Sequence, residues 1–125
     1  MIRFHSLLSA LFLLATTFTP AFADDEATSA GRKIFENRCA SCHQNTPSST
    51  TLGPSLVGII GKKAGTENSG VHSRAVVESG IVWDRNSLRR YLSDPGRDIP
   101  GTVMPVRVED PKELGELLDY LETLR

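Results

Sequence analysis

The sequence is poor in large aromatic residues, which limits the core that it can build. Beyond residue 23 the aromatic side chains are Phe35, Trp83, Tyr91 and Tyr120. A chain of about 100 residues forms one domain with a modest core, and so few aromatic side chains make that core thin. We therefore expect a bound apolar group to supply part of the missing bulk.

The sequence also lacks an excess of positive charge. It contains 14 lysines and arginines against 15 aspartates and glutamates, a net charge of −1 at pH 7. Proteins that bind nucleic acid present a basic surface to the phosphates. The composition therefore argues against a nucleic-acid partner.

No apolar run is long enough to cross a membrane, which takes about 20 residues. The run from Leu7 to Ala15 is preceded by Arg3 and followed by the small-x-small site Ala21-Phe22-Ala23. These are the three parts of a secretory signal. We predict cleavage after Ala23, so that residues 1–23 are a signal peptide and residues 24–125 form the mature domain, without a membrane span.

Cysteine is scarce, but its two copies stand in one motif, Cys39-Ala40-Ser41-Cys42-His43. A C-x-x-C-H run indicates covalent attachment of a c-type haem. The two thiols can each add to a vinyl group of one porphyrin, and the following histidine is then held under the ring as the proximal iron ligand. The motif predicts one haem c, attached through Cys39 and Cys42.

Three other interpretations of the cysteines fit less well. A redox-active C-x-x-C is expected near a strand–helix–strand pattern, which we do not find. A structural zinc site needs four ligands, and residues 24–125 offer only the two cysteines, His43 and His72, with Cys42 and His43 adjacent. A simple disulfide would leave His43 without a role.

Four further residues are candidates for the same site. Met104 is the only methionine beyond Met1 and lies in a loop between two prolines, which favours iron ligation over core packing, and His72 is its main competitor. The carbonyl of Pro54 is a candidate acceptor for the His43 ring N–H, although an ordinary turn fits the sequence equally well. The indole N–H of Trp83 needs an acceptor if buried, and a haem propionate is one candidate.

Apolar spacing and capping residues predict four helices. The first spans about Ala27 to Cys42, with Asp25, Thr28 or Ser29 as its cap. A short helix runs from Ser73 to Ser79. The others start after Asp84, ending near Asp94, and after Asp110.

With its motifs in order, C-A-S-C-H, G-P-S-L, Trp83, Y-L-S-D-P and I-P-G-T-V-M, the sequence resembles the class I cytochromes c of the short soluble mitochondrial and c2-like type. The resemblance covers nearly all of residues 24–125. It implies a small all-α fold in which the N- and C-terminal helices cross and loops wrap around one covalently bound haem. Gly31 and Phe35 would lie at that crossing, near Leu117 and Tyr120.

The resemblance also implies roles for single residues. His43 and Met104 would be the axial ligands, Pro54 would steady His43, Trp83 would bond a propionate, and Tyr91 would lie beside the Met104 sulfur. Lys62 stands where many members carry an arginine near a propionate, and His72 where a propionate-binding tyrosine is common.

The expected function is that of a soluble periplasmic electron carrier, a monomer that docks transiently with redox proteins and is not an enzyme. Val103 and Gly96 stand at positions where the family often has lysine. The ring of lysines that steers many such carriers to their partners is therefore depleted, and the identity of those partners does not carry over to this chain. The alternatives are a dedicated haem subunit or electron acceptor of a periplasmic dehydrogenase complex and, less favoured, a haem ligand sensor or peroxidase.

Overall fold

The computed structural model describes residues 23–50, 52–67 and 72–125, and the predicted signal peptide lies almost wholly outside these residues. The described chain contains helices and loops and no strand, apart from an isolated bridge between Lys63 and Val82. The helices are α1 (Ala23–Arg38), α2 (Arg74–Glu78), α3 (Arg85–Ser93), α4 (Pro95–Asp98) and α5 (Pro111–Thr123). None of the described helices is long and apolar enough to span a bilayer.

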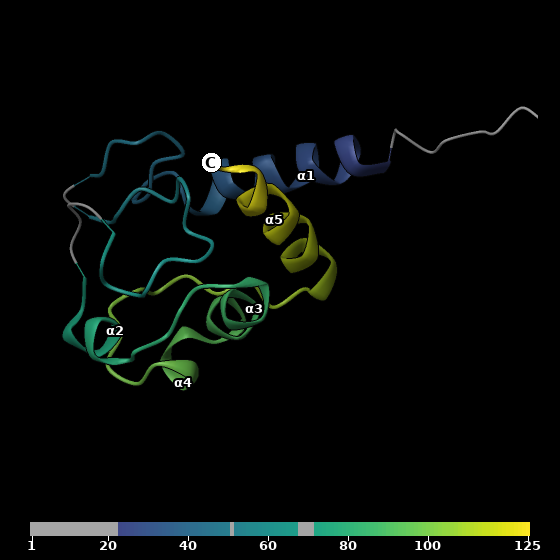
Figure 1. Cartoon of the computed structure of the whole chain (residues 1–125). Helices are drawn as coiled ribbons and strands as arrows, with labels where there is room; N and C mark the ends of the chain where they lie inside the picture. The colour runs from purple at the N-terminus through teal and green to yellow at the C-terminus, as the bar shows by residue number, and fades with distance from the viewer. Residues whose placement is uncertain (1–22, 51, 68–71) are drawn as a thin grey trace, which may run out of the picture.

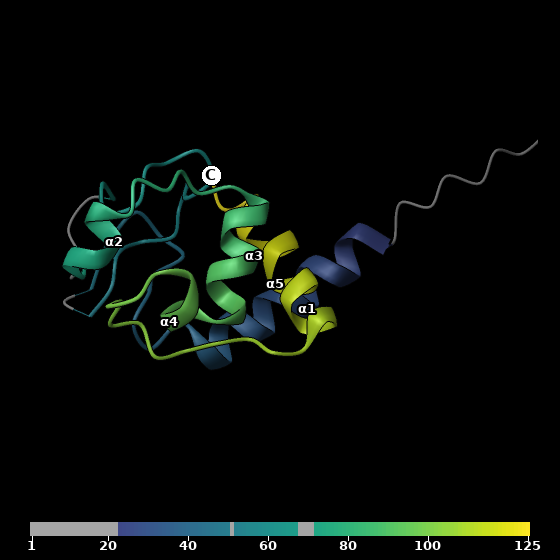
Figure 2. The same ribbon diagram turned by 90° about the horizontal axis from the view of Figure 1, so that it is seen from below.

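Helices α1 and α5 cross and form one end of the molecule (Figures 1 and 2). At the crossing, a Cβ added to Gly31 would lie 1.9 Å from the Glu116 carbonyl oxygen and 2.7 Å from Tyr120 Cβ. The absent side chain of Gly31 thus lets the two backbones touch. One turn further along, the rings of Phe35 and Tyr120 pack with their centroids 5.6 Å apart. The predicted crossing is confirmed.

The predicted bounds of the first helix are wrong at both ends, since α1 spans Ala23–Arg38 instead of Ala27–Cys42. The helix ends where the N–H groups of Cys39 and Ala40 share the Phe35 carbonyl, at 2.8 and 3.0 Å, so that the regular series of one N–H per carbonyl stops. The C-x-x-C-H motif therefore lies in turns that follow the helix. At the start of α1, the three residues proposed as caps (Asp25, Thr28 and Ser29) lie within the helix. The negative charge of Asp25 in the first turn interacts favourably with the positive end of the helix dipole.

The starts of the later helices are confirmed. Ser73 caps α2, Asp84 caps α3 in a capping box with Ser87, and Asp110 caps α5 by accepting from two backbone N–H groups. The sequence did not predict α4, the single turn that begins at Pro95 with Asp94 as its cap.

Between α1 and α2, the described residues 39–50 and 52–67 form an irregular loop that lies to the left of α1 and α5 in Figure 1. Its first part folds back on the C-x-x-C-H turn through the Thr50 hydroxyl, which donates to the Cys42 carbonyl at 2.6 Å. The N–H groups of Leu52 and Gly53 both bond to Thr50 Oγ1 at 3.1 Å. This local network brings the G-P-S-L turn against His43.

Candidate functional site

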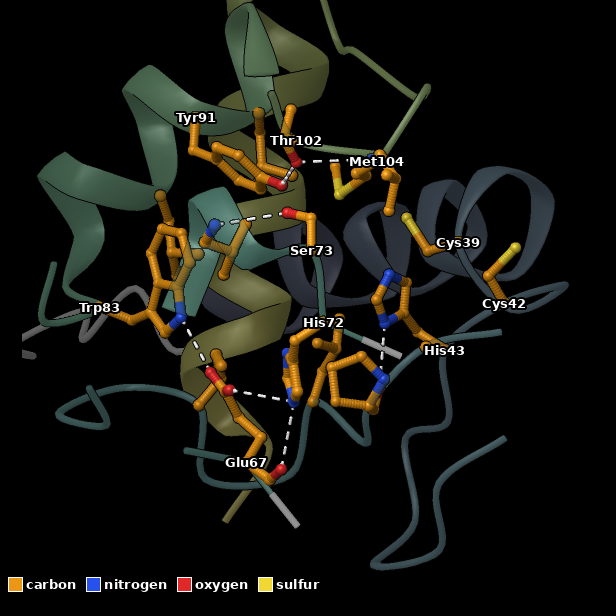
Figure 3. Close-up of a pocket in the computed structure, with 18 of the residues that line it drawn as sticks. Cys39, Cys42, His43, Glu67, His72, Ser73, Trp83, Tyr91, Thr102 and Met104 are labelled. Carbon is orange, nitrogen blue, oxygen red and sulfur yellow. Dashed lines mark hydrogen bonds and ion pairs between the residues drawn. The ribbon is translucent and has the colours of Figure 1, made fainter. Parts of the chain in front are cut away.

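One cavity lies between this loop, helices α3 and α5, and the segment that follows α4. All of the predicted site residues except Lys62 line it. Figure 3 shows the labelled side chains of His43 and Met104 reaching into the cavity from different segments, with Cys39 and Cys42 at one side and Trp83 at the other. The remaining lining is mainly aliphatic, with Leu52, Leu56, Ile59, Val76, Leu88, Leu92, Val103, Pro105, Leu117 and Leu121.

The imidazole of His43 is held in one tautomer. Its Nδ1 atom lies 2.9 Å from the Pro54 carbonyl oxygen. A carbonyl oxygen only accepts hydrogen bonds, so Nδ1 carries the proton and the neutral ring keeps a free lone pair on Nε2. A metal-binding histidine uses this arrangement, in which the second nitrogen is fixed by a backbone carbonyl.

Gly53 packs directly against the same ring, a contact that the sequence did not predict. A Cβ at this position would lie 2.8 Å from His43 Cε1 and 2.9 Å from the Cys42 carbonyl oxygen. Only a residue without a side chain leaves room for the imidazole here. The Gly53-Pro54 pair therefore both orients His43 and makes space for it.

Met104 lies half-buried in the cavity wall, in the loop between Pro100 and Pro105. Its backbone N–H points to Thr102 Oγ1 at 3.4 Å, and the same hydroxyl shares a hydrogen bond of 2.6 Å with Tyr91 Oη. Thr102 thus connects Tyr91 of α3 to the Met104 loop. Burial raises the pKa of the Tyr91 phenol, so the phenol stays protonated and keeps this bond at neutral pH.

The two cysteines form no disulfide, and both lie half-buried in the cavity lining. Before haem attachment, burial raises the pKa of the Cys39 thiol to about 11, so the unreacted group is a thiol and not a thiolate at neutral pH. Within the described ranges, no cluster of three or more His, Cys, Asp or Glu side chains could hold a metal ion.

Three predicted propionate contacts have other geometry in the structure. Lys62 is exposed and lies outside the lining, where its Nζ donates to the Val57 carbonyl at 3.0 Å. The Trp83 indole N–H donates to Glu67 Oε1 at 2.9 Å, and His72 Nε2 lies 3.2 Å from the Glu67 carbonyl oxygen. Their roles toward a propionate stay predictions.

Glu67 is the cavity residue that sequence reasoning missed altogether. It lies within the loop between α1 and α2, in a stretch without periodicity that belongs to none of the motifs, so nothing in the sequence marked it. Thr102 lies inside the I-P-G-T-V-M motif, but the sequence assigned it no role. Its hydrogen bond to Tyr91 is seen only in the structure.

The residues of the cavity fit a haem c. Two cysteine sulfurs at one side match the two attachment points, the mainly apolar walls match a porphyrin face, and the lining includes the His43 imidazole and the Met104 thioether as donors for iron. Histidine with methionine is a known axial set for haem iron. The chemistry of the donor set therefore agrees with the covalent attachment that the C-x-x-C-H motif predicts.

Comparisons with known proteins support the same conclusion. Residues 28–125 match the Cytochrome c family. The cytochrome c2 of Blastochloris viridis is 36% identical over 120 residues, which cover 94% of this chain and 92% of that protein. The cytochrome c2 of Rhodopila globiformis is 35% identical over 96 residues, which cover 76% of this chain and 91% of that protein.

Among solved structures, the cytochrome cH of Methylobacterium extorquens aligns with a TM-score of 0.71 and 36% sequence identity, covering 77% of this chain and 97% of that one. The fold is thus the cytochrome c fold, with a covalently bound haem c that the thiols of Cys39 and Cys42 attach. From its motif, its cavity and these relatives, the chain belongs to the cytochrome c family of electron-transport haem proteins.

Proposed function

We propose that this chain is a soluble, monomeric periplasmic carrier of single electrons, with His43 and Met104 as the axial ligands of its one haem c. The observation that supports this most is the shared cavity of the two side chains, in which the Pro54 carbonyl leaves His43 Nε2 free to bind iron. When bound, the haem supplies a ferric–ferrous couple that accepts and releases one electron.

The chain's own residues suit that exchange. With a histidine and a thioether on the two sides of the iron, no position stays open for a substrate, which favours transfer over catalysis. The hydrogen bond that His43 Nδ1 donates to the Pro54 carbonyl and the one between Thr102 and Tyr91 hold the two ligand-bearing segments in place before the electron arrives. A fixed ligand set needs little rearrangement between the two oxidation states.

A redox partner would meet an apolar surface where exposed side chains line the cavity. Leu52 and Val103 both line the cavity and are 66% and 67% exposed. A docking surface of this kind excludes water from a transient contact without the strong steering that a ring of lysines provides.

The optical spectrum of the oxidised, haem-loaded protein tests the ligation. We expect the weak far-red sulfur-to-iron band in the wild type, its loss in Met104→Ala, and its survival in His72→Gln, the matched control for the competing ligand. A wild type without the band that binds carbon monoxide readily after reduction would refute this ligation and favour sensing or peroxidase chemistry.

The intact mass of the exported protein tests the processing. Cleavage after Ala23 with one haem predicts the mass of residues 24–125 plus a single haem. A mass that includes residues 1–23 would contradict both the cleavage and the assignment of these residues to a signal peptide.

The exposed apolar pair Leu52 and Val103 also favours a second candidate, a dedicated haem subunit of a periplasmic dehydrogenase complex. Gel filtration of the periplasmic fraction, followed by haem absorbance, separates the two. A free carrier elutes as a small monomer, whereas a dedicated subunit elutes with the large complex at low and at high salt.

A further inference from the structure

The loop that follows the C-x-x-C-H motif is bonded to the C-terminal end of α5 at two points. Near its start, the side-chain amide of Asn45 donates to Tyr120 Oη at 2.9 Å. Near its end, the Gly58 N–H donates at 2.7 Å to the carbonyl of Leu124, the C-cap of α5. Figures 1 and 2 both show this end of α5 beside the loop. Residues 44–58, described except for residue 51, are called the 44–58 loop below.

Between these two points the 44–58 loop is stiffened by hydrogen bonds of its own. The Leu56 N–H donates to the Gln44 carbonyl at 2.9 Å. The Ser55 hydroxyl donates to the Thr46 carbonyl, and the Ser55 N–H donates to Ser49 Oγ at 3.0 Å. Because these bonds join the two arms of the loop, a shift at either attachment point is passed to the residues between them.

The backbone group that orients His43 belongs to this same loop. His43 Nδ1 donates to the Pro54 carbonyl at 2.9 Å, and Gly53 lies so close to the ring that a Cβ there would be 2.8 Å from His43 Cε1. The ring therefore lies against a piece of backbone whose position depends on where the 44–58 loop is held. An acceptor on the second nitrogen raises the basicity of a metal-binding histidine, so the place of the Pro54 carbonyl affects the electron density on Nε2.

Tyr120 is a firm anchor for the loop. Its side chain is 5% exposed, and its ring packs against Phe35 of α1 with the centroids 5.6 Å apart. The hydroxyl group carries the bond to Asn45, and neither Tyr120 nor Asn45 lines the haem cavity. The bond between them therefore lies outside the site and acts on it through the loop.

We propose that Tyr120, through its bond to Asn45, is a positioning residue for His43, because it holds the 44–58 loop where the Pro54 carbonyl meets Nδ1. This inference rests on the proposed carrier function, in which His43 binds the iron. A weaker bond from Nδ1 to the carbonyl makes the imidazole a poorer electron donor, which disfavours the ferric state more than the ferrous state. Loss of the Tyr120–Asn45 bond therefore raises the reduction potential.

Three substitutions that leave the net charge unchanged test the proposal. Tyr120→Phe removes the hydroxyl and keeps the ring that packs against Phe35. Asn45→Leu replaces the amide by an apolar group of similar size. Thr123→Val is the matched control, since it removes a hydroxyl from the same turn of α5, where Thr123 Oγ1 donates at 2.6 Å to the Tyr120 carbonyl within the helix.

The first measurement is spectroelectrochemical titration of the haem-loaded proteins. We expect the midpoint potential to rise by a similar amount in Tyr120→Phe and Asn45→Leu, to rise no further in the double variant because both remove the same bond, and to stay at the wild-type value in Thr123→Val. A lower melting temperature with an unchanged potential would mean a merely structural bond and would overturn the proposal. Additive shifts, or a fall in potential, would overturn it as well.

Amide hydrogen exchange in the reduced protein tests the attachment of the loop separately. The Gly58 N–H at the far end of the loop should exchange roughly fivefold faster in Tyr120→Phe, the factor that corresponds to one ordinary hydrogen bond. The Leu88 N–H, which bonds to the Asp84 carbonyl at the start of α3, is the internal reference and should not change.

Unchanged exchange at Gly58, or equal acceleration at Gly58 and Leu88, would show that the Tyr120 hydroxyl does not hold the loop and would overturn the proposal. A wild type without the far-red sulfur band would refute the Met104 ligation, whereas the exchange of Gly58 decides the attachment of the loop whichever residue is the sixth ligand. If Asn45→Leu does not fold, Tyr120→Phe and Thr123→Val still decide between the outcomes.

Discussion

The crossing of α1 and α5 leads to a sharp prediction for Gly31→Ala. The added methyl group would meet the Glu116 carbonyl oxygen at 1.9 Å and Tyr120 Cβ at 2.7 Å. The first of these atoms belongs to the α5 backbone and cannot rotate away. The two helices must therefore separate, although the whole of α5 is held by its apolar face, which includes the fully buried Leu117 and Leu118.

Overpacking a well-packed site costs about 1–3 kcal/mol of stability. Because the added methyl group of Gly31→Ala meets backbone, which cannot rotate away, we expect a cost at the upper limit, about 3 kcal/mol. Alanine regains about 0.5–1 kcal/mol over glycine within a helix. The net loss of about 2 kcal/mol corresponds to a melting temperature lower by about 8–16 °C for a domain of this size.

Gly115→Ala is the matched control, the same substitution on the partner helix. A Cβ added to Gly115 has no atom within 4 Å, so only the helix propensity changes. We expect the stability to rise by about 0.5–1 kcal/mol and the melting temperature by about 2–8 °C. Helical circular dichroism of the haem-loaded proteins, followed through thermal and urea unfolding, measures both variants.

The reasoning fails if Gly31→Ala is as stable as the wild type, or if the two variants shift in the same direction. A destabilised variant should also perturb the haem spectrum, because Leu117 and Leu121 of α5 line the cavity. Such a change would show that α5 transmits a packing defect at its crossing with α1 to the haem cavity.

Two further predictions concern the ligand-bearing segments. Gly53→Ala places a methyl group 2.8 Å from His43 Cε1, so we expect a weakened far-red band and a shifted midpoint potential, and a spectrum identical to the wild type would contradict this. Burial raises the pKa of Tyr91 above the value near 10 of an unfolded tyrosine, so its folded form favours the protonated phenol. That contribution to stability is complete below pH 10 and is lost as the pH rises through the folded pKa. The difference in unfolding free energy between wild type and Tyr91→Phe, measured in urea at pH 8 and 11, should therefore shrink at the higher pH, and a constant difference would show that Tyr91 does not titrate differently on folding.

The residues that could be predicted from the sequence are those whose partners lie nearby in the chain. The caps at Ser73, Asp84 and Asp110 bond to N–H groups two or three residues away, so residue type and position were enough. The turn at Pro95 is just as local, but its helix is a single turn, too short to show an apolar period.

The end of α1 shows where such reasoning stops. The apolar spacing continues through Cys39, and periodicity alone therefore extends the helix to Cys42. In the structure the helix ends at Arg38, and the following turn is held by the Thr50 hydroxyl, which donates to the Cys42 carbonyl across eight residues. A contact that closes a loop of this length leaves no periodic trace in the sequence.

The sequence by itself determined the haem attachment site, the pair of candidate ligands and the family, because covalent chemistry depends on the residue types in one short motif. Only the tertiary structure decided that Gly31 touches the backbone of α5 and that the Trp83 indole lies within hydrogen-bond distance of Glu67. Those contacts join residues 85 and 16 positions apart. Their geometry depends on how the whole chain packs around the cavity, and no local pattern encodes it.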